Sequence, residues 1–468
     1  MKILRSVQCL LLVVCAGSAA DWAPLPLRLE VTGVQPMTGI VLWADHERNT
    51  TDAIALEFSY MSFASVSPAE GVWNWKPVDS LLDAIGSRKH QAVLRFRYEY
   101  VAERTTVPAW IQAKAGYQET VGKSEGQDTW FSDWRSEDLK KFSLDFHTAF
   151  AARYQDDPRL AFVQVGFGLW AEYHIYEGPM ILGRTFPDRA FQAKFLTHLD
   201  TVYTRLPWSI SIDAANDWAP FDSLPALKPL RFGLFDDSFL HKTHDADNRP
   251  NWLYFGADRW KRRMAGGELS YYSDFDQLHA LDAAGMYGRT FESQAARYGI
   301  SFMIGSDQPS YQTLDRIKAA SRSTGYRFRA VAWDVSPDSF RLCVKNVGVA
   351  PLYRDAWPVV GPDTGRTSLK GLVPGDSLWY WFRARVGGAP PPVPRLLCGH
   401  CLPGKGIELE ADLSGDAAVI DRRSRARQAG PWIWTTSGWR IQSHQNPGAP
   451  DRTVQGRSVP SERNSRAP

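Results

Sequence analysis

Length, composition and charge set the first limits on this chain. It has 468 residues, of which 44% are hydrophobic and 22% charged, so it is long enough for two or three domains with a large core. The net charge is +3, but residues 421–468 hold nine Arg and three acidic residues, which leaves the rest slightly acidic. This balance gives no reason to expect nucleic acid as a partner. We expect the basic tail, 421–468, to be disordered.

The first 20 residues have the pattern of a secretory signal peptide. Lys2 and Arg5 precede the short apolar run 10–14, and the small residues 16–20 follow it. The run is too short to span a bilayer, which takes roughly 20 apolar residues, and no later segment is longer or cleaner. Cys15 would suit a lipid anchor, but two Val stand where that signal needs small residues. We therefore expect a secreted protein, periplasmic or extracellular, without a membrane span.

Three cysteines remain once such a signal is removed: Cys343, Cys398 and Cys401. Pairing is expected in an oxidising compartment, which predicts one disulfide and one free thiol. The segment 398–401 (Cys-Gly-His-Cys) resembles a redox or zinc motif, but it lacks a second ligand pair. We expect its role to be structural.

Short β-rich apolar runs alternate with longer amphipathic segments between residues 39 and 322, which is typical of a parallel sheet wrapped by helices. Eight runs predict strands: Gly39–Trp43, Ala53–Phe58, Ala92–Arg97, Leu160–Phe167, Trp208–Asp213, Leu230–Asp236, Met264–Leu269 and Ile300–Ile304. Helical spacing is found at Pro77–Ser87, Ser136–Tyr154, Asp188–Leu206, Phe275–Tyr298 and Tyr311–Ser323. Eight alternations predict an α/β fold, a (β/α)8 TIM barrel, which we place at residues 21–324.

After Gly325 the chain changes to alternating strands separated by Pro, Gly and Asp turns. Strands are predicted at Tyr326–Asp334, Ser339–Asn346, Trp357–Val360 and Asp376–Arg385, with one or two more up to about Ile420. The pattern predicts a small all-β, immunoglobulin-like sandwich at residues 325–420. An extended Pro-rich connection runs through 389–394.

Acidic residues are concentrated directly after the predicted barrel strands. The carboxyl ends of those strands form the mouth where TIM-barrel active sites lie. Glu172 follows the fourth strand and Glu268 lies at the end of the seventh. Further polar residues at strand ends are Arg97, Glu99, Asp213, Asp236 and Asp237, and Tyr271 comes just after Glu268.

Two carboxyls at opposite sides of a barrel mouth suit the cleavage of a glycosidic bond. One must protonate the leaving oxygen while the other attacks or stabilises the anomeric carbon, at about 5 to 5.5 Å separation for retention of configuration. Their mutual repulsion would raise one pKa into the range of a working acid. The alternative is that Glu172 and Glu268 merely pair with Arg95 or Arg97. An Arg filling the gap, or a separation much beyond about 9.5 Å, would exclude both standard mechanisms.

The segment 68–75 (Pro-Ala-Glu-Gly-Val-Trp-Asn-Trp) resembles the stretch after the second strand in clan A glycoside hydrolases. That resemblance implies Glu172 as acid/base and Glu268 as nucleophile. The chain is more closely similar to the bacterial group labelled domain of unknown function 4832 over roughly residues 35 to 385. The segments that carry this likeness are Trp170–His174, Phe235–Phe239, Gly266–Glu268, Thr324–Phe328 and Asn346–Pro351.

One position departs from the clan pattern. Asn usually precedes the fourth-strand Glu and bonds the sugar 2-hydroxyl, whereas this chain has Ala171. Losing such a bond could cost several kcal/mol of transition-state stabilisation. Two functions therefore stay open: a retaining glycoside hydrolase or transglycosylase, and a non-catalytic carbohydrate-binding or cell-surface protein on a degenerate barrel.

The remaining candidates concern binding of an oligo- or polysaccharide. The chain has 19 Trp, and Trp43, Trp170 and Trp218 could form platforms for sugar rings. We expect Arg97, Glu99, Trp170, Asp213, Asp236, Asp237 and Tyr271 to contact substrate, with Tyr271 orienting the nucleophile through its hydroxyl. No cofactor is expected and no metal. The weaker alternative is a metal at His241, His244, Asp245 and Asp247, which we place in a long solvated loop after the sixth strand.

Overall fold

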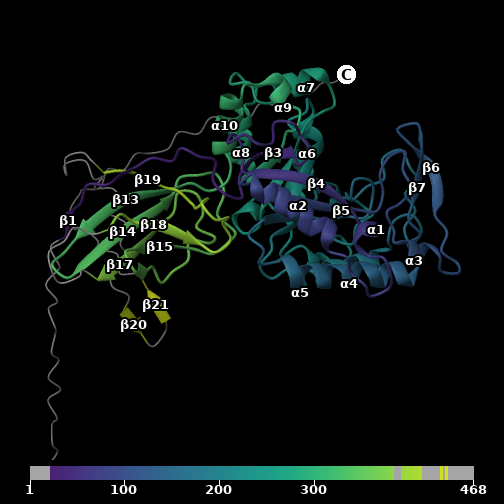
Figure 1. Ribbon diagram of the computed structural model, residues 1–468, viewed down its shortest axis with the longest axis horizontal. Coiled ribbons are helices and arrows are strands. Elements are labelled where there is room, and N and C mark those ends of the chain that lie inside the picture. The colour runs from purple at the N-terminus through teal and green to yellow at the C-terminus, as the bar shows by residue number, and fades with distance from the viewer. Residues whose placement is uncertain (1–21, 384–391, 414–432, 436–437, 441–468) are drawn as a thin grey trace, which may run out of the picture. The chain divides into compact units, whose positions relative to one another are not determined.

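The computed structural model describes residues 22–383, 392–413, 433–435 and 438–440, and its centre is a closed barrel of eight parallel strands (Figure 1). The hydrogen-bonded order around the barrel is β10-β11-β12-β3-β4-β5-β8-β9, closed by the pairing of β9 with β10. The strands are β3 (Gly39–Trp43), β4 (Leu56–Ser62), β5 (Gln91–Arg97), β8 (Leu160–Gln164), β9 (Trp208–Ser211), β10 (Gly233–Phe239), β11 (Ala265–Leu269) and β12 (Phe302–Ile304). All eight predicted strands are confirmed, and so is the TIM-barrel fold.

Helices lie outside the barrel strands, where amphipathic spacing predicted them (Figure 1). The longer ones are α2 (Lys76–Ser87), α4 (Glu137–Tyr154), α5 (Arg189–Val202), α6 (His244–Tyr254), α8 (Phe291–Tyr298) and α10 (Leu314–Arg322). Single turns or short helices are α1 (Phe63–Val66), α3 (Ala109–Gln112), α7 (Asp274–His279) and α9 (Gln308–Tyr311). Ser136 caps the N-terminus of helix α4, since its hydroxyl accepts a hydrogen bond from the Leu139 amide at 3.2 Å.

One predicted helix and one predicted loop need correction. The stretch 275–298 is not one helix, because Gly285 and Gly288 adopt φ of +74° and +73° between α7 and α8. Residues after the sixth strand are not a solvated loop either, because α6 begins at His244. His241 is 5% exposed and His244 is fully buried.

The barrel interior is apolar at its floor and polar at its mouth. Inward side chains of the floor include Phe58, Phe162 and Phe302, and the last two stack with ring centroids 4.9 Å apart. Further along the same strands, the inward positions change to Tyr60 on β4 and Arg95 on β5, whose guanidinium lies over the Phe58 and Tyr60 rings. Polar chemistry is therefore confined to the carboxyl ends of the strands, on a rigid apolar base.

The second module contains two sheets. One has the path β17-β14-β13-β19-β2 with β1 paired to β13, and the other has the order β16-β15-β18. Their strands are β1 (Ala23–Pro24), β2 (Arg28–Leu29), β13 (Phe328–Val335), β14 (Ser339–Asn346), β15 (Ala356–Val360), β16 (Asp363–Thr364), β17 (Ser377–Arg383), β18 (Arg395–Cys398) and β19 (Leu409–Asp412). An all-β module is present as predicted, but β13 and β19 are parallel, and an immunoglobulin-like topology is not confirmed.

The boundary between barrel and module differs from the prediction at the N-terminal side. Strands β1 and β2, residues 23–29, pair with β13 and β19 and so belong to the β module rather than to the barrel. These pairings join segments more than 300 positions apart, which local sequence patterns do not encode. Barrel and module together form one compact unit within residues 1–415.

The expected disulfide is absent, since the three described cysteines are free. Cys343 is buried in β14, whereas Cys398 and Cys401 lie at and just after the end of β18 in the other sheet. A hydrogen bond between the two neighbouring thiols lowers the pKa of Cys398.

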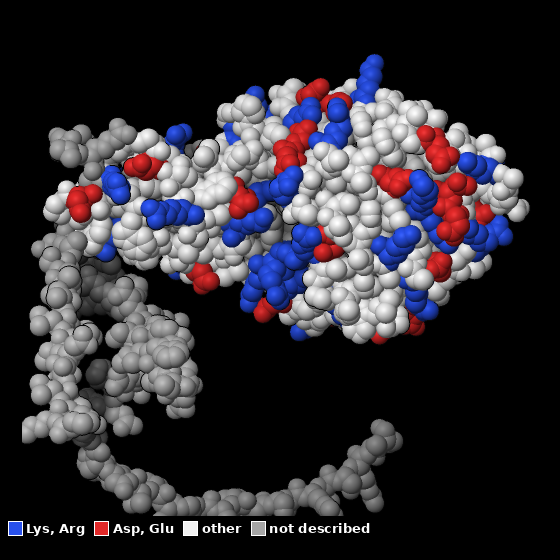
Figure 2. Space-filling view, turned by 90° about the horizontal axis from the view of Figure 1, so that it is seen from below, with Lys and Arg blue, Asp and Glu red and all other residues white. Residues whose placement is uncertain are grey.

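The termini lie mostly outside the described residues, including the predicted signal peptide 1–20 and most of the tail 421–468. Within the tail, β20 (Ile433–Thr435) and β21 (Gly438–Arg440) pair antiparallel, with Trp434 opposite Trp439. In the described part of the chain no helix is long and apolar enough to cross a membrane. Acidic and basic side chains are interspersed on the face drawn in Figure 2.

Candidate active site

An open pocket of about 500 Å³ lies at the carboxyl ends of the barrel strands. Both Glu172 and Glu268 line it. Five aromatic residues form much of its wall: Trp43, Tyr60, Tyr100, Trp170 and Tyr271. The pocket thus combines two carboxyl groups with rings that could stack on the faces of a sugar.

Glu172 is positioned by a tightly wound loop after β8. Two glycines make the winding possible, because a Cβ on Gly166 would lie 2.1 Å from the Ala171 carbonyl oxygen, and one on Gly168 would lie 1.9 Å from that of His174. The amides of Gly168 and Leu169 donate to the carbonyl oxygens of Glu172 and His174 at 2.9 and 3.1 Å. The loop therefore returns on itself and delivers Glu172 to the pocket.

Gly168→Ala should destabilise this loop strongly, by about 2 kcal/mol or more in the free energy of unfolding, because the new methyl group overlaps a backbone oxygen that cannot move independently. Chemical denaturation measures this change. Gly406→Ala is the control, since its methyl group would meet nothing within 4 Å. Equal stability of the two variants would contradict the packing described for the loop.

Ala171 belongs to a tight turn that directly precedes Glu172. Trp170 and Ala171 have φ of 56° and 58°, and the Glu172 amide donates to the Leu169 carbonyl oxygen at 3.0 Å. Left-handed φ at both central residues is typical of the tight turns of β-hairpins. Ala171 is fully buried in this turn. Its side chain supplies no polar group to the pocket.

Glu268 stands on β11, where it pairs with Ile304 of β12. The neighbouring Gly267 permits close approach of β10, because a Cβ there would lie 2.3 Å from the Asp236 carbonyl oxygen. Burial raises the pKa of Glu268 to about 7; Arg95 lowers it, and Glu172 and Asp307 raise it further. Among the described residues, none forms a hydrogen bond or ion pair with its carboxyl group. Glu268 can therefore hold a proton at neutral pH.

Arg95 is the buried cation of the site. It is 0% exposed, and its guanidinium lies 4.3 Å from the centroid of the Phe235 ring. One nitrogen, Nη1, donates to Glu172 Oε1 at 2.9 Å, and Nε donates to Gln164 Oε1 at 3.0 Å. Arg95 does not line the pocket, whereas both Glu residues do. Arg95 therefore pairs with Glu172, as the alternative to a catalytic role predicted. It does not occupy the pocket itself.

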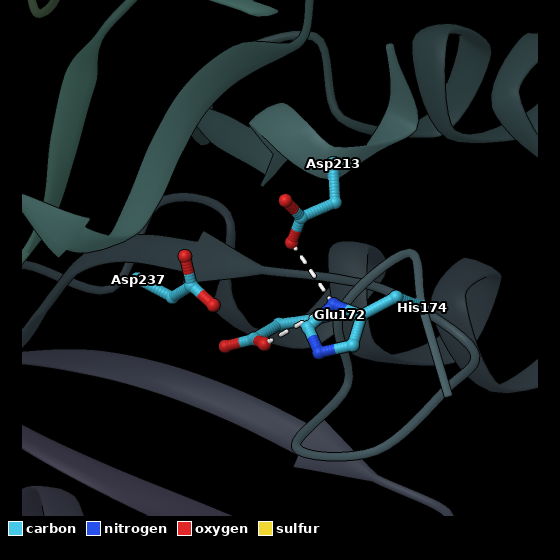
Figure 3. A group of neighbouring side chains, drawn as sticks. All are labelled: Glu172, His174, Asp213 and Asp237. Carbon is cyan, nitrogen blue, oxygen red and sulfur yellow. Dashed lines mark hydrogen bonds and ion pairs between the residues drawn. The ribbon is translucent and has the colours of Figure 1, made fainter. Parts of the chain in front are cut away.

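Glu172 also belongs to a cluster with His174, Asp213 and Asp237 (Figure 3). The Glu172 carboxyl group lies between Asp237 and the His174 ring, and His174 Nδ1 is 3.0 Å from Asp213 Oδ2 (Figure 3). Ser211 donates to the same Asp213 oxygen at 2.6 Å. The cluster thus brings together three carboxyls and one imidazole from the ends of neighbouring strands.

The charges in this cluster are unequal. Burial lowers the pKa of His174, but the hydrogen bond and attraction to Asp213 raise it to about 9, so the ring is protonated at neutral pH. Burial raises the pKa of Asp213, but the same hydrogen bond leaves it below its ordinary value. Burial and repulsion from Asp213 and Glu172 raise the pKa of Asp237 well above its ordinary value. Asp237 is therefore the member of the cluster whose ionised form is most disfavoured.

Glu172 lies between these influences. Burial raises its pKa, and although Arg95, His174 and a hydrogen bond with Asp237 act in the opposite direction, the pKa of Glu172 stays above its ordinary value. Its Oε2 has no hydrogen-bond partner among the described residues, although the side chain is 4% exposed. The four residues of the cluster offer ligand atoms within 4.8 Å of one another and could hold a cation. Arg95 and His174 already supply positive charge beside Glu172.

The other predicted contacts divide into two groups. Trp43, Trp170 and Tyr271 line the pocket, and Tyr271 is 46% exposed. Its hydroxyl forms no hydrogen bond with any described residue, so the expected bond to Glu268 is not present. Trp218, 42% exposed, lies outside the pocket lining.

Arg97 and Glu99 are also absent from the pocket lining. Arg97 pairs with Glu103 at 2.8 Å and lies over the Tyr100 ring. Glu99 is fully buried and accepts a hydrogen bond from the Ser132 amide at 2.9 Å. The segment that carries Ser132 follows the hairpin of β6 (Thr120–Ser124) and β7 (Gln127–Phe131), which is bonded to the loop after β5 through Trp130 and Thr129. An inserted hairpin was not foreseen from the sequence, and Glu99 is enclosed for that reason.

Asp236 faces helix α6 instead of the mouth. Its fully buried carboxylate accepts hydrogen bonds from Asn248 at 2.6 Å, Trp252 Nε1 at 2.8 Å and the Ser238 amide at 3.1 Å, and contacts His244 Nε2 at 3.1 Å. Successive residues of a strand point to opposite faces, so only Asp237 of this pair turns inward. The expected substrate contact of Asp236 is replaced by a structural role, and His244 is part of the same network.

Asp236→Ala should lower the free energy of unfolding by about 3 to 5 kcal/mol, because three buried donors lose their acceptor at once. Thermal and urea unfolding measure the change. The exposed Asp363→Ala on β16 is the matched control and should stay within about 0.5 kcal/mol of the parent. If Asp236→Ala lowered the free energy of unfolding no more than the control does, the structural role of Asp236 would be contradicted.

Several residues of the pocket were not predicted. The rule that site residues lie at the carboxyl ends of barrel strands could have found Tyr60 and Asp307. Tyr60 is near the end of β4, and Asp307 follows β12. Tyr100 comes from the loop after β5, and Glu125 from the turn between β6 and β7. Arg95 was named from the sequence as a possible ion-pair partner of the two Glu, and that pairing is present for Glu172.

No family model matches the sequence, and no curated protein matches it. Solved structures similar to the chain include the catalytic domain of β-amylase from Paenibacillus polymyxa, at 10% identity and a TM-score of 0.38, covering 63% of this chain and 99% of that one. An α-galactosidase from Thermus thermophilus gives 14% identity and a TM-score of 0.37, covering 68% and 66% of the two chains. A GH5_18 protein from Streptomyces cattleya gives 14% and 0.36, covering 62% and 79%.

Proposed function

We propose that this chain is a secreted glycoside hydrolase or transglycosylase that acts on an oligo- or polysaccharide by a retaining mechanism with two carboxyl groups. The observation that carries the proposal is the shared pocket: Glu268, with a pKa of about 7, and Glu172, bonded to Arg95, line one aromatic-walled cavity. A proton donor and an anion facing the same space are what glycosidic bond cleavage needs.

The electrostatics favour a division of roles opposite to the one that the clan resemblance implies. Burial raises the pKa of Glu172, but Arg95, His174 and a hydrogen bond with Asp237 all favour its ionised form, which suits a nucleophile. Glu268 has no bonded cation among the described residues and holds its proton near neutral pH, which suits the acid that protonates the leaving oxygen. We therefore propose Glu172 as nucleophile and Glu268 as acid/base.

The test is hydrolysis of a panel of α- and β-aryl glycosides and of plant, fungal and bacterial polysaccharides. The parent protein is compared with Glu172→Gln and Glu268→Gln, and proton NMR records the anomeric configuration of the first product. We expect activity with retained configuration in the parent and loss in both variants. Inverted product would contradict the retaining mechanism, and unchanged activity in either variant would remove that residue from the site.

The second candidate is a carbohydrate-binding protein that does not cleave, and Ala171 favours it because no polar side chain stands at that position of the pocket loop. It predicts that no member of the panel is hydrolysed while glycan binding is retained in the parent and in both Gln variants. Calorimetric titration with the same polysaccharides separates the two candidates.

A further inference from the structure

The pocket is strongly acidic. Five carboxyl residues line it and neither Lys nor Arg does: Asp45, Glu125, Glu172, Glu268 and Asp307. Glu172 and Glu268 lie deep in the pocket, whereas Asp45, Glu125 and Asp307 are exposed at its rim. Among the described residues, His46 is the only other titratable lining group besides the tyrosines.

This negative charge is mostly uncompensated. Within the described part of the chain, Glu172 pairs with Arg95 and lies 3.7 Å from His174, and Glu268 holds a proton near neutral pH, but Asp45, Glu125 and Asp307 form no ion pair. The repulsion is felt inside the pocket, since Asp307 and Glu172 both contribute to the raised pKa of Glu268. Glu172 Oε2 is buried and has no hydrogen-bond partner among those residues, and positive charge already lies beside it on His174, whose Nδ1 is 3.7 Å away. A sugar that brings positive charge would relieve repulsion that a neutral sugar leaves in place.

Asp307 is the rim residue that we consider for binding a positively charged group of the sugar. Asp307 follows β12, directly after Ser306, whose hydroxyl accepts a hydrogen bond from the Trp43 amide at 3.1 Å. On its other side, β12 pairs with β11 at Glu268. Asp307 therefore follows a residue bonded to the Trp43 backbone, lines the same pocket as Glu268, and contributes to the raised pKa of Glu268.

The aromatic wall supports the same ligand chemistry independently. Trp and Tyr faces attract ammonium groups as well as the C–H faces of sugar rings. Five such rings line the pocket, including Trp43 beside Asp307 and Tyr271 beside Glu268. A uronic acid would be repelled here, because no Lys or Arg of the lining would offset its carboxylate.

We infer that the sugar bound next to Glu268 carries a free, protonated amino group, so that the substrate is a hexosamine oligomer or polymer that is not N-acetylated. This inference rests on the proposed function and adds the substrate class to it. Asp307 is the specificity-determining residue that pairs with the ammonium group, with Asp45 contributing charge from the loop after β3.

The experiment compares tetrasaccharides that differ in one substituent, the amino, acetamido or hydroxyl group, in both the gluco and galacto series. Binding to the full chain is measured by calorimetry at pH 6, where amines are protonated. We expect the amino form of one series to bind at least about tenfold more tightly than its hydroxyl form, which corresponds to about 1.4 kcal/mol. The preference should shrink as salt is added.

Asp307→Asn should remove most of that preference, and the matched control Asp363→Asn, which removes the same charge on exposed β16, should leave it intact. Equal binding of amino and hydroxyl forms would overturn the substrate class while leaving the proposed function standing if the panel is hydrolysed. Failure of every sugar to bind or react would overturn both. Stoichiometric binding of Ca²⁺ or Mg²⁺ to the sugar-free protein, lost in Asp307→Asn, would assign the acidic rim to a metal ion and overturn the inference.

Discussion

Glu172→Ala is expected to lower kcat/KM by about 10⁴-fold or more on the substrate that the panel identifies, because it removes the proposed nucleophile. Added azide should restore turnover of an activated aryl glycoside, since a small anion can enter the space left by the side chain. Attack by azide on the face that Glu172 occupied gives a glycosyl azide of inverted configuration. NMR of the azide product records this outcome.

Glu268→Ala should behave differently, because a general acid matters little when the leaving group departs easily. Aryl glycosides with acidic phenols should still form the glycosyl-enzyme, and azide should then yield a product of retained configuration. The two variants control for each other, since both remove one carboxyl group from the same pocket. If Glu172→Ala gave the retained azide and Glu268→Ala the inverted one, the roles would be those implied by the clan resemblance.

Arg95→Met should have the second large effect. The change removes the cation that lowers the pKa of both Glu172 and Glu268, so both pKa values rise. Glu172 must be ionised and Glu268 protonated for the reaction, so both limbs of the pH–rate profile should move to higher pH. Weaker stabilisation of the anion should also lower kcat by about 10² to 10³.

Arg95→Met should also destabilise the fold, by about 3 to 5 kcal/mol at neutral pH, because it leaves the Glu172 carboxylate buried without its partner. The loss should be smaller at low pH, where Glu172 can take up a proton. Arg97→Met is the control: it breaks the ion pair with Glu103, whose side chain is 48% exposed, and should leave the limbs of the profile in place. If the limbs of the pH–rate profile did not move in Arg95→Met, the proposed effect of Arg95 on the pKa values of Glu172 and Glu268 would be contradicted.

The barrel could be predicted from the sequence because its signals are local. Apolar runs and helical spacing recur along the chain, and each strand prediction needed only its own residues. The helix predicted at 275–298 was wrong where two glycines take positive φ, which spacing alone does not disclose. The assignment of residues 23–29 to the barrel was wrong because their partners, β13 and β19, are remote in sequence.

The site could be predicted in part for the same reason. The rule that chemistry follows barrel strands brought Glu172 and Glu268 to one pocket, but it could not say which way a side chain at a strand end turns. Asp236 and Asp237 are adjacent in sequence, and only the strand's alternation decides that one holds α6 and the other faces Glu172. Enclosure of Glu99 depends on an inserted hairpin, and the roles of the two Glu depend on Arg95, whose contacts are set by the closed barrel.

The central claim, a protonated Glu268 facing an ionised Glu172, is tested most directly by NMR titration of the side-chain carboxyl carbons in protein labelled with ¹³C-glutamate. Glu172→Gln and Glu268→Gln assign the two resonances, and no substrate is needed. We predict a Glu268 carboxyl that titrates near pH 7, with Glu172 still ionised at the pH where Glu268 holds its proton. Titration of Glu268 near its ordinary pKa of 4.5, or protonation of Glu172 before Glu268 as the pH falls, would contradict the account.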